Sequence, residues 1–182
     1  IAECAFFMAS LEVPLPVMQR GLEIAKRNNV PTILNPAPAV TLPDEVYGLC
    51  DYFTPNETEA SFLAGIPVET TDQASEAAQI FIDRGVKTAV ITLGENGVYV
   101  QNSEIRQHVP AFNMEDKVLE TTGAGDAFNG GFAYALAEGM PLTEAVRFGS
   151  ATAAISVTRL GTAPAMPYNA EIQELLDSEN NR

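Results

Sequence analysis

The 182-residue sequence is poor in basic residues, in cysteine and in long hydrophobic runs. It has 10 lysines and arginines and 24 aspartates and glutamates, which gives a net charge of −14. This argues against nucleic acid as a partner, because binding nucleic-acid phosphates requires clustered lysine and arginine side chains. Cys4 and Cys50 form neither a disulfide framework nor a metal-ligand spacing, so we expect two reduced core residues in a cytoplasmic protein.

Membrane insertion is not expected either. The longest uncharged apolar stretch with helical character, 148–158, is far shorter than the roughly 20 residues of a membrane span, and no signal peptide opens the chain. The chain starts with Ile1 at what looks like a buried strand, so we expect a truncated or processed polypeptide. No repeat, low-complexity tract or linker divides it, and we expect a single part over residues 1–182.

Short apolar runs alternate with amphipathic stretches, which is typical of parallel strands joined by crossover helices and predicts an α/β fold. The expected strands lack polar alternation and should be central in the sheet; they are 5–8, 31–34, 52–54 and 88–93. The expected intervening helices are 16–28, 56–64 and 72–84.

The pattern then changes. Residues 95–97 predict a tight hairpin that opens an antiparallel section running through 98–101 and 105–112. Helices are expected at 124–138, after a glycine-rich turn, at 142–158, after Pro141, and at 169–177, before a polar tail.

The segment 121–131, Thr-Thr-Gly-Ala-Gly-Asp-Ala-Phe-Asn-Gly-Gly, joins a loop to a helix. Glycines 123 and 125 would let backbone N–H groups approach an anion, to which the helix N-terminus adds unpaired donors. Asp126 would repel a phosphate unless it has another task, such as accepting a proton from an attacking hydroxyl. The combination indicates phosphoryl transfer; the structural alternative is a helix cap after a turn.

Two other phosphate-binding classes are excluded. The sequence has no G-x-x-x-x-G-K-[ST] motif, and its G-x-G lacks the third glycine of a dinucleotide fingerprint.

The segment 55–60, Pro-Asn-Glu-Thr-Glu-Ala, follows a short strand. Asn56 and Glu59 predict either a capping box or a water-mediated magnesium site beside a nucleotide, and spacing does not choose between them.

Three further segments carry weaker signals. Thr92 and Gly94 end a predicted strand, where a hydroxyl and a bare backbone could face a nucleotide. The segment 35–39, Asn-Pro-Ala-Pro-Ala, has two prolines that stiffen the loop, and a structural role is expected. His108, the sole histidine, lies in the antiparallel section with no serine or cysteine motif near it, which favours a surface or strand role.

Taken together, segments 35–39, 56–60, 91–94 and 121–128 resemble, in order and spacing, the ribokinase family of carbohydrate kinases, also called the phosphofructokinase B type. The resemblance runs from about residue 1 to residue 177, and 35–39 and 56–60 are more similar to ribokinases than to fructokinases or adenosine kinases. It implies a three-layer α/β/α, Rossmann-like sheet with an antiparallel section. It also implies MgATP-dependent phosphorylation of a sugar's primary hydroxyl, with ribose as the leading substrate.

The family's roles carry over residue by residue. Asp126 would be the base, and the amides of Gly123, Ala124 and Gly125 would stabilise charge on the transferring phosphoryl. Asn56 and Glu59 would serve magnesium and the phosphates. The residues expected along the nucleotide are Asn56, Thr92, Gly94 and Thr122.

Two departures from the family are visible. The family usually has aspartate where this chain has Glu120, and that aspartate contributes to a potassium site near the turn at 159–161, so potassium dependence is left open. The family's N-terminal portion, with its sugar-binding motif and β-sheet lid, through which subunits often pair as homodimers, has no counterpart here. We expect little or no sugar kinase activity from this chain alone.

The alternatives come from two classes. One is a catalytically silent nucleotide-binding fragment or regulatory module, which would bind without transfer. The other is a related kinase acting on fructose, a deoxyketo-acid sugar or a nucleoside.

Overall fold

The computed structural model describes residues 1–114 and 117–180. Their backbone forms two compact units. Unit 1 comprises Ile1–Gly94 and Val98–His108, and unit 2 comprises Glu95–Gly97 and Val109–Arg182.

Unit 1 is built on a six-stranded sheet in which neighbours in sequence are neighbours in space. Its strands are β1 (Phe7–Ser10), β2 (Thr32–Asn35), β3 (Tyr52–Phe53), β4 (Thr88–Thr92), β5 (Val98–Gln101) and β6 (Arg106–Val109). The first four are parallel, and β5 runs antiparallel to β4. The predicted parallel strands at 31–34, 52–54 and 88–93 and the hairpin at 95–97, part of which is a 3-10 turn (Gly94–Asn96), are confirmed.

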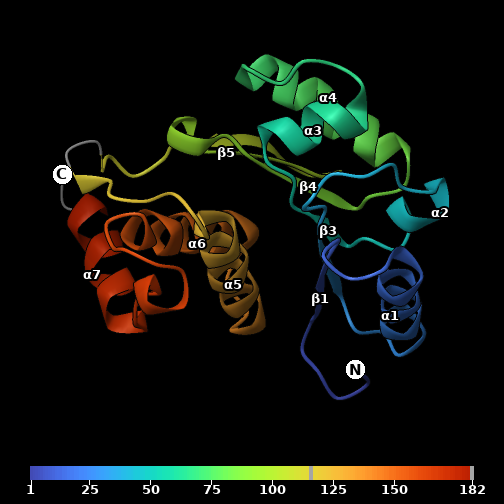
Figure 1. The fold of residues 1–182 in the computed structure, drawn as a ribbon, viewed down its shortest axis with the longest axis horizontal. Helices are drawn as coiled ribbons and strands as arrows, with labels where there is room; N and C mark the ends of the chain where they lie inside the picture. Colours follow the sequence, from blue (N-terminus) through green and yellow to red (C-terminus); the bar gives the residue numbers. More distant parts are fainter. Residues whose placement is uncertain (115–116, 181–182) are drawn as a thin grey trace. The chain divides into compact units, whose positions relative to one another are not determined.

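Helices connect the parallel strands, as the alternating pattern predicts. They are α1 (Leu15–Arg27), α2 (Asp44–Tyr47), α3 (Glu57–Ala64) and α4 (Thr71–Asp83). Figure 1 shows all four on the same face of the sheet. The α/β class is therefore confirmed, and the ends of α1, α3 and α4 lie within two residues of expectation, whereas α2 was not expected.

The core of unit 1 lies between this face and the helices. Three aromatic rings pack together in it, with ring centroids 5.6 Å apart for the tilted pair Tyr47 and Phe53 and 5.1 Å apart for the edge-to-face pair Phe53 and Phe81. Tyr47 comes from α2, which sequence analysis missed because four residues are too short to show a helical period. The guanidinium of Arg84 covers the Tyr47 ring at 3.8 Å.

Two expectations for the start of the chain are wrong. The first strand begins at Phe7 instead of residue 5, and it is an edge strand of the described sheet, with Met8 46% exposed. Cys4 lies before it and is exposed, whereas Cys50 is buried as expected. Burial raises the pKa of Cys50 to about 12, which keeps its thiol protonated.

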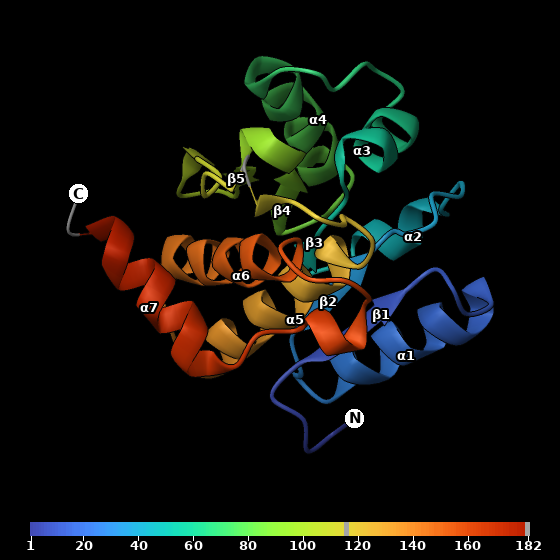
Figure 2. The same ribbon diagram turned by 60° about the vertical axis from the view of Figure 1, so that its left-hand side comes forward.

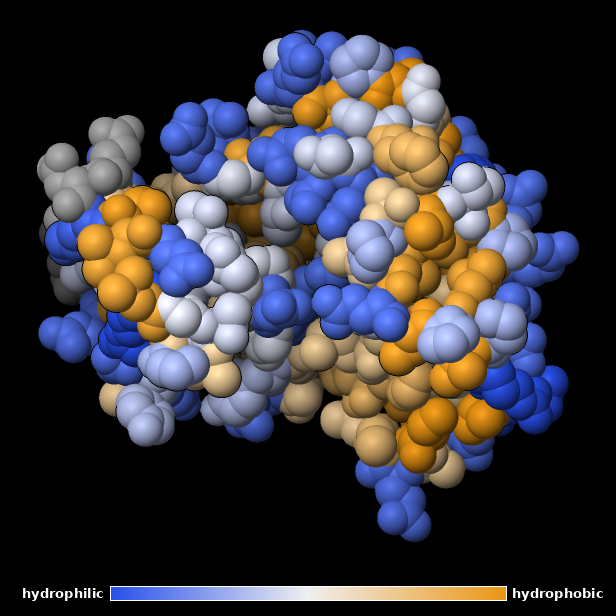
Figure 3. Space-filling model, viewed as in Figure 1, coloured by the Kyte–Doolittle hydropathy of each residue, from blue (hydrophilic) through white to orange (hydrophobic). Residues whose placement is uncertain are grey.

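Figure 3 shows hydrophobic patches near α1 and α2 on the surface of unit 1.

Unit 2 is mainly helical. It contains α5 (Ala124–Ala137), α6 (Leu142–Ser156), a 3-10 turn (Ala163–Ala165) and α7 (Asn169–Asn180), which runs further than the predicted end at 177. Figure 2 shows α5 and α6 side by side, and α7 packs against α6. In the described part of the chain, no helix has the length and hydrophobicity of a membrane span.

The close contact between α5 and α6 depends on two glycines, which have no side chain. A Cβ at Gly131 would lie 2.3 Å from Oγ1 of Thr152, and one at Gly149 would lie 2.9 Å from the carbonyl oxygen of Phe128. By contrast, a Cβ at Gly130 would meet no atom within 4 Å. Neighbouring glycines of α5 therefore differ in purpose: Gly131 allows close helix packing, and Gly130 does not serve it.

This difference predicts opposite effects of two substitutions. Gly131→Ala should destabilise the protein by about 1–3 kcal/mol, because the added methyl overpacks the helix contact. Gly130→Ala should stabilise it by about 0.5–1 kcal/mol, because alanine is the better helix former and the space is open. Urea unfolding of both variants beside wild type measures the two changes. Equal effects of the two substitutions would contradict the packing argument.

Candidate functional site

In unit 1, the predicted pair Asn56 and Glu59 lies at the start of α3, directly after β3. The N–H of Glu59 donates to Oδ1 of Asn56 at 2.9 Å, and the N–H of Asn56 donates to Oε2 of Glu59 at 2.9 Å. The capping box, the structural alternative of the sequence analysis, is thus present. It fixes both side chains at the carboxyl end of a parallel strand.

Thr92 and Gly94 lie next to this pair. Asn56 and Thr92 form a parallel β-bridge, and the N–H of Thr92 donates to the carbonyl oxygen of Pro55 at 3.0 Å. The backbone of Gly94 is left-handed at φ +53°, and Oε1 of Glu57 would lie 3.3 Å from a Cβ there. The structure therefore brings four predicted residues together and adds Glu57, which only the spatial contact with Gly94 reveals.

The Glu59 carboxyl is in an unusual environment for an acid. Glu59 as a whole residue is only 9% exposed. Burial raises its pKa above the usual 4.5, and the neighbouring Glu57 carboxylate adds to the rise, while the hydrogen bond from the Asn56 N–H opposes it. An ionised Glu59 is therefore held at a cost in stability, which a nearby cation would relieve.

The oxygen atoms of Asn56 and Glu59 are chemically suited to a magnesium ion. Magnesium prefers oxygen ligands and keeps several waters, and the capping box uses one carboxylate oxygen of Glu59. The described residues contain no cluster of three or more His, Cys, Asp or Glu side chains that could hold a metal ion. Any magnesium here would thus be bound by few protein atoms together with water and substrate phosphates.

In unit 2, the predicted phosphate-binding turn opens α5. Gly123 is the residue before the helix and has a left-handed backbone at φ +81°, which favours glycine. The N–H of Ala124 donates to the carbonyl oxygen of Thr121 at 3.1 Å and so closes the turn. Within the described residues, no backbone bond is formed by the N–H groups of Gly123 and Gly125.

Asp126 projects from the first turn of α5 and is exposed, as is Thr122 in the preceding loop. Nδ2 of Asn129 donates to the carbonyl oxygen of Gly125 at 2.9 Å and steadies this turn. Asn129 belongs to the 121–131 motif, but no role was predicted for it. Its spacing of four residues from Gly125 could have indicated this side-chain hydrogen bond to the helix backbone.

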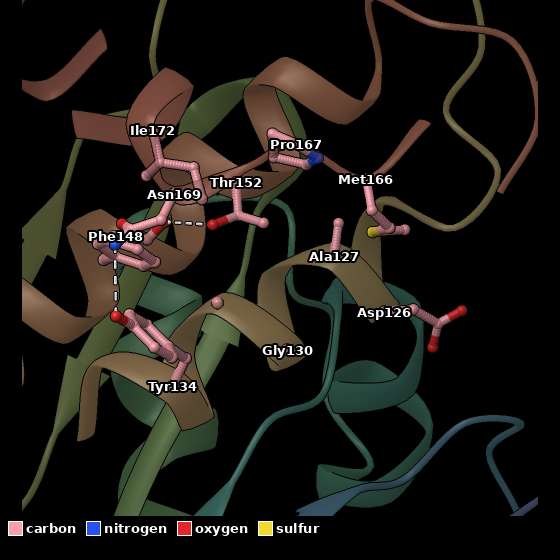
Figure 4. Close-up of a pocket in the computed structure, with 11 residues that line it drawn as sticks. Asp126, Ala127, Gly130, Tyr134, Phe148, Thr152, Met166, Pro167, Asn169 and Ile172 are labelled. Atoms are coloured by element: carbon pink, nitrogen blue, oxygen red, sulfur yellow. Dashed lines mark hydrogen bonds between the residues drawn. The ribbon is translucent and has the colours of Figure 1, made fainter. Parts of the chain in front are cut away.

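A cavity of about 290 Å³ lies beside Asp126, between α5, α6 and the start of α7. Its walls are mostly apolar and include Phe148, Met166 and Ile172. Figure 4 shows the Asp126 carboxylate at one end, directed away from Tyr134 and the other side chains of the cavity. The carboxylate therefore faces outward, where a substrate hydroxyl could approach it.

The remaining candidates fall elsewhere. His108 is exposed on β6, as expected. The 35–39 loop packs against the end of β1, where the N–H of Leu11 donates to the carbonyl oxygen of Ala37 at 2.9 Å, in line with a structural role. Oδ1 of Asn35 is buried and has no hydrogen-bond partner among the described residues.

The fold and these two groups of residues define a class: an α/β protein whose strand ends and glycine-rich helix start suit nucleotide phosphates. The model of the pfkB family of carbohydrate kinases matches residues 3–169, so the chain belongs to this family, as the sequence resemblance predicts.

Relatives and solved structures agree. The chain is 44% identical over 177 residues to Haemophilus influenzae ribokinase and 36% identical over 177 residues to Salmonella typhi deoxyribokinase; each match covers 97% of this chain and 57% of the relative. A structure of Arabidopsis thaliana ribokinase with ribose and ATP superposes with a TM-score of 0.92 at 32% identity, covering 96% of this chain and 56% of that one. The chain thus spans a little over half of these relatives' length.

The environment of Glu59 predicts a pH-dependent gain in stability on substitution. Because the folded-state pKa of Glu59 is raised, ionisation lowers stability as the pH rises from about 4.5 through that pKa. Glu59→Gln keeps a capping side chain and cannot ionise. Its melting temperature relative to wild type should rise between pH 4 and pH 7, measured by differential scanning calorimetry. A difference that is constant with pH would contradict the assignment.

Proposed function

We propose that the chain is the nucleotide-binding and catalytic part of an ATP-dependent sugar kinase. The γ-phosphoryl of MgATP would be transferred to a primary hydroxyl, with ribose to ribose 5-phosphate as the leading reaction. One observation carries the proposal: the exposed Asp126 carboxylate lies in the first turn of a helix whose opening N–H groups at Gly123 and Gly125 form no backbone bond in the described residues. A base and an anion-binding group occur within four residues.

In this proposal Asp126 accepts the proton of the attacking hydroxyl, which strengthens the nucleophile as the phosphoryl group leaves ATP. The N–H groups of Gly123 and Gly125 stabilise the charge on the phosphoryl oxygens. Ala124 was expected to share this task, but its N–H already closes the turn with Thr121, so its contribution is smaller. Thr122, exposed before the turn, would contact the nucleotide.

The residues of unit 1 are assigned to the nucleotide and its metal. Thr92 and Gly94 would lie along ATP, since the left-handed, side-chain-free Gly94 permits close approach of a ligand to the backbone. Asn56 and Glu59 would hold the hydrated magnesium and orient the phosphates. Bound magnesium would neutralise phosphate charge. We also propose that residues 1–182 act together as a single nucleotide-binding and catalytic part.

The choice of ribose is supported by relatives. The similar proteins of Haemophilus influenzae and Salmonella typhi are named ribokinase and deoxyribokinase, and the Arabidopsis thaliana structure contains ribose and ATP. The two sugars differ by the 2-hydroxyl, so competition between ribose and 2-deoxyribose is the informative comparison. An acidic protein of this family would work in the cytoplasm, with ATP and a sugar as its small-molecule partners.

Nucleotide binding is testable with the chain itself. At about 100 times its dissociation constant, MgATP should add about 2.7 kcal/mol to the free energy of unfolding. Differential scanning fluorimetry should show a rise in melting temperature with MgATP that is smaller in Glu59→Gln. No rise at millimolar MgATP would contradict nucleotide binding.

Asp126→Asn separates the kinase from a silent nucleotide-binding module. The substitution should leave the MgATP-induced rise in melting temperature at least as large as in wild type, because the amide does not repel phosphate. In the whole protein it should lower ribose-dependent ADP release by about 10²–10⁴-fold, the usual contribution of a general base. Glu138→Gln, at the other end of α5, is the control. Transfer that survives Asp126→Asn would remove Asp126 as the base, and binding without transfer in wild type would favour the silent module.

A further inference from the structure

Glu120 makes a contact that none of the assigned roles uses. Its Oε2 accepts a hydrogen bond from the N–H of Gly161 at 2.9 Å, across 41 positions in the sequence. The N–H groups of Leu119 and Glu120 itself both donate to the carbonyl oxygen of Val157, at 2.8 and 3.2 Å. Three hydrogen bonds thus join the segment that leads into α5 to the turn that follows α6.

The turn after α6 also contacts the start of α5 directly. A Cβ at Gly123 would lie 3.2 Å from Cγ2 of Thr162, so the Thr162 methyl packs against the glycine that opens the helix. Thr162 immediately follows Gly161, whose backbone is left-handed at φ +87°. Holding Gly161 in place therefore holds Thr162 against Gly123.

The same contacts bear on the monovalent cation that the family resemblance implies near this turn. A cation would need oxygen atoms that face an open position. Here the Oε2 atom of Glu120 faces the N–H of Gly161, and the carbonyl oxygen of Val157 faces two N–H groups. N–H donors thus already engage Oε2 of Glu120 and the Val157 carbonyl oxygen and compete with an ion for both, so these two oxygen atoms fit hydrogen bonds better than a cation.

We propose that Glu120 is a positioning residue that keeps the start of α5 in shape by its direct hydrogen bond to Gly161, in place of a monovalent cation. The inference rests on the proposed function, in which the N–H groups of Gly123 and Gly125 receive phosphoryl oxygens. In this chain the glutamate at the position of the family's aspartate places its carboxylate within hydrogen-bond distance of the Gly161 backbone.

Two variants separate the hydrogen bond from a charge-dependent cation site. Glu120→Gln keeps an oxygen acceptor and removes the charge, whereas Glu120→Ala removes both. The amide resonances of Gly123, Gly125 and Gly161, read by NMR without nucleotide, should shift in Glu120→Ala and stay close to wild type in Glu120→Gln. Glu174→Ala, on the exposed face of α7, is the control and should leave them unchanged.

Potassium provides the second arm. In wild type, replacing choline chloride by potassium chloride should leave the three resonances in place and change the MgATP dissociation constant by less than about twofold. Glu120→Ala should weaken MgATP binding about tenfold, or about 1.4 kcal/mol, in either salt. The proposal is overturned if potassium moves the wild-type resonances, or if Glu120→Gln behaves like Glu120→Ala.

These readouts also keep the two proposals apart. If wild type fails to bind MgATP in either salt, nucleotide binding is refuted, while the amide resonances still decide what Glu120 does. If MgATP binds and Glu120→Ala leaves the resonances and the affinity unchanged, the positioning role is refuted and the kinase proposal stands.

Discussion

The left-handed backbone of Gly123 is the constraint on which the chemistry proposed for unit 2 depends. It ends the incoming loop, lets the Ala124 N–H close a turn onto Thr121, and so leaves the N–H groups of Gly123 and Gly125 without backbone partners in the described residues. A side chain there would be strained by its backbone and would crowd Thr162. The close contact of Gly131 with Thr152 then packs the same helix against α6, and this packing helps to orient the turn that we propose binds phosphoryl oxygens.

At the start of α3, structure and proposed chemistry use the same atoms. The capping box of Asn56 and Glu59 was weighed in the sequence as an alternative to a magnesium site, yet one does not exclude the other. The hydrogen bond to Asn56 fixes Glu59, and burial makes its ionised form unfavourable. A fixed, poorly solvated carboxylate gains more from a hydrated cation than a mobile surface one does, so the capping box would also prepare the magnesium site that we propose.

Much of the fold was predictable because its signals are local. Uninterrupted apolar runs located the central strands, amphipathic stretches located the helices, and the capping pair of Asn56 and Glu59 marked the start of α3. The second capping box, of Thr70 and Gln73 at the start of α4, was not recognised in the sequence. What failed depends on distant partners. The edge position of β1 depends on which strands pair, Cys4 lies before that strand, and the four-residue α2 is anchored in the core by the contacts of Tyr47 with distant aromatic rings. The site residues were readable as motifs, whereas Glu57 beside Gly94 required coordinates.

Glu120 shows how a departure from a family pattern is to be interpreted. In the sequence, glutamate in place of aspartate only casts doubt on a potassium site. In the structure, the Glu120 carboxylate accepts a hydrogen bond from a backbone N–H 41 residues away. A backbone N–H group carries a partial positive charge in a fixed position, and the fold supplies it without the binding of an ion. If Glu120 holds the turn as we propose, the Gly161 N–H supplies the positive partner that a cation would otherwise provide. The amides proposed to bind phosphoryl oxygens would then be organised before any ligand arrives.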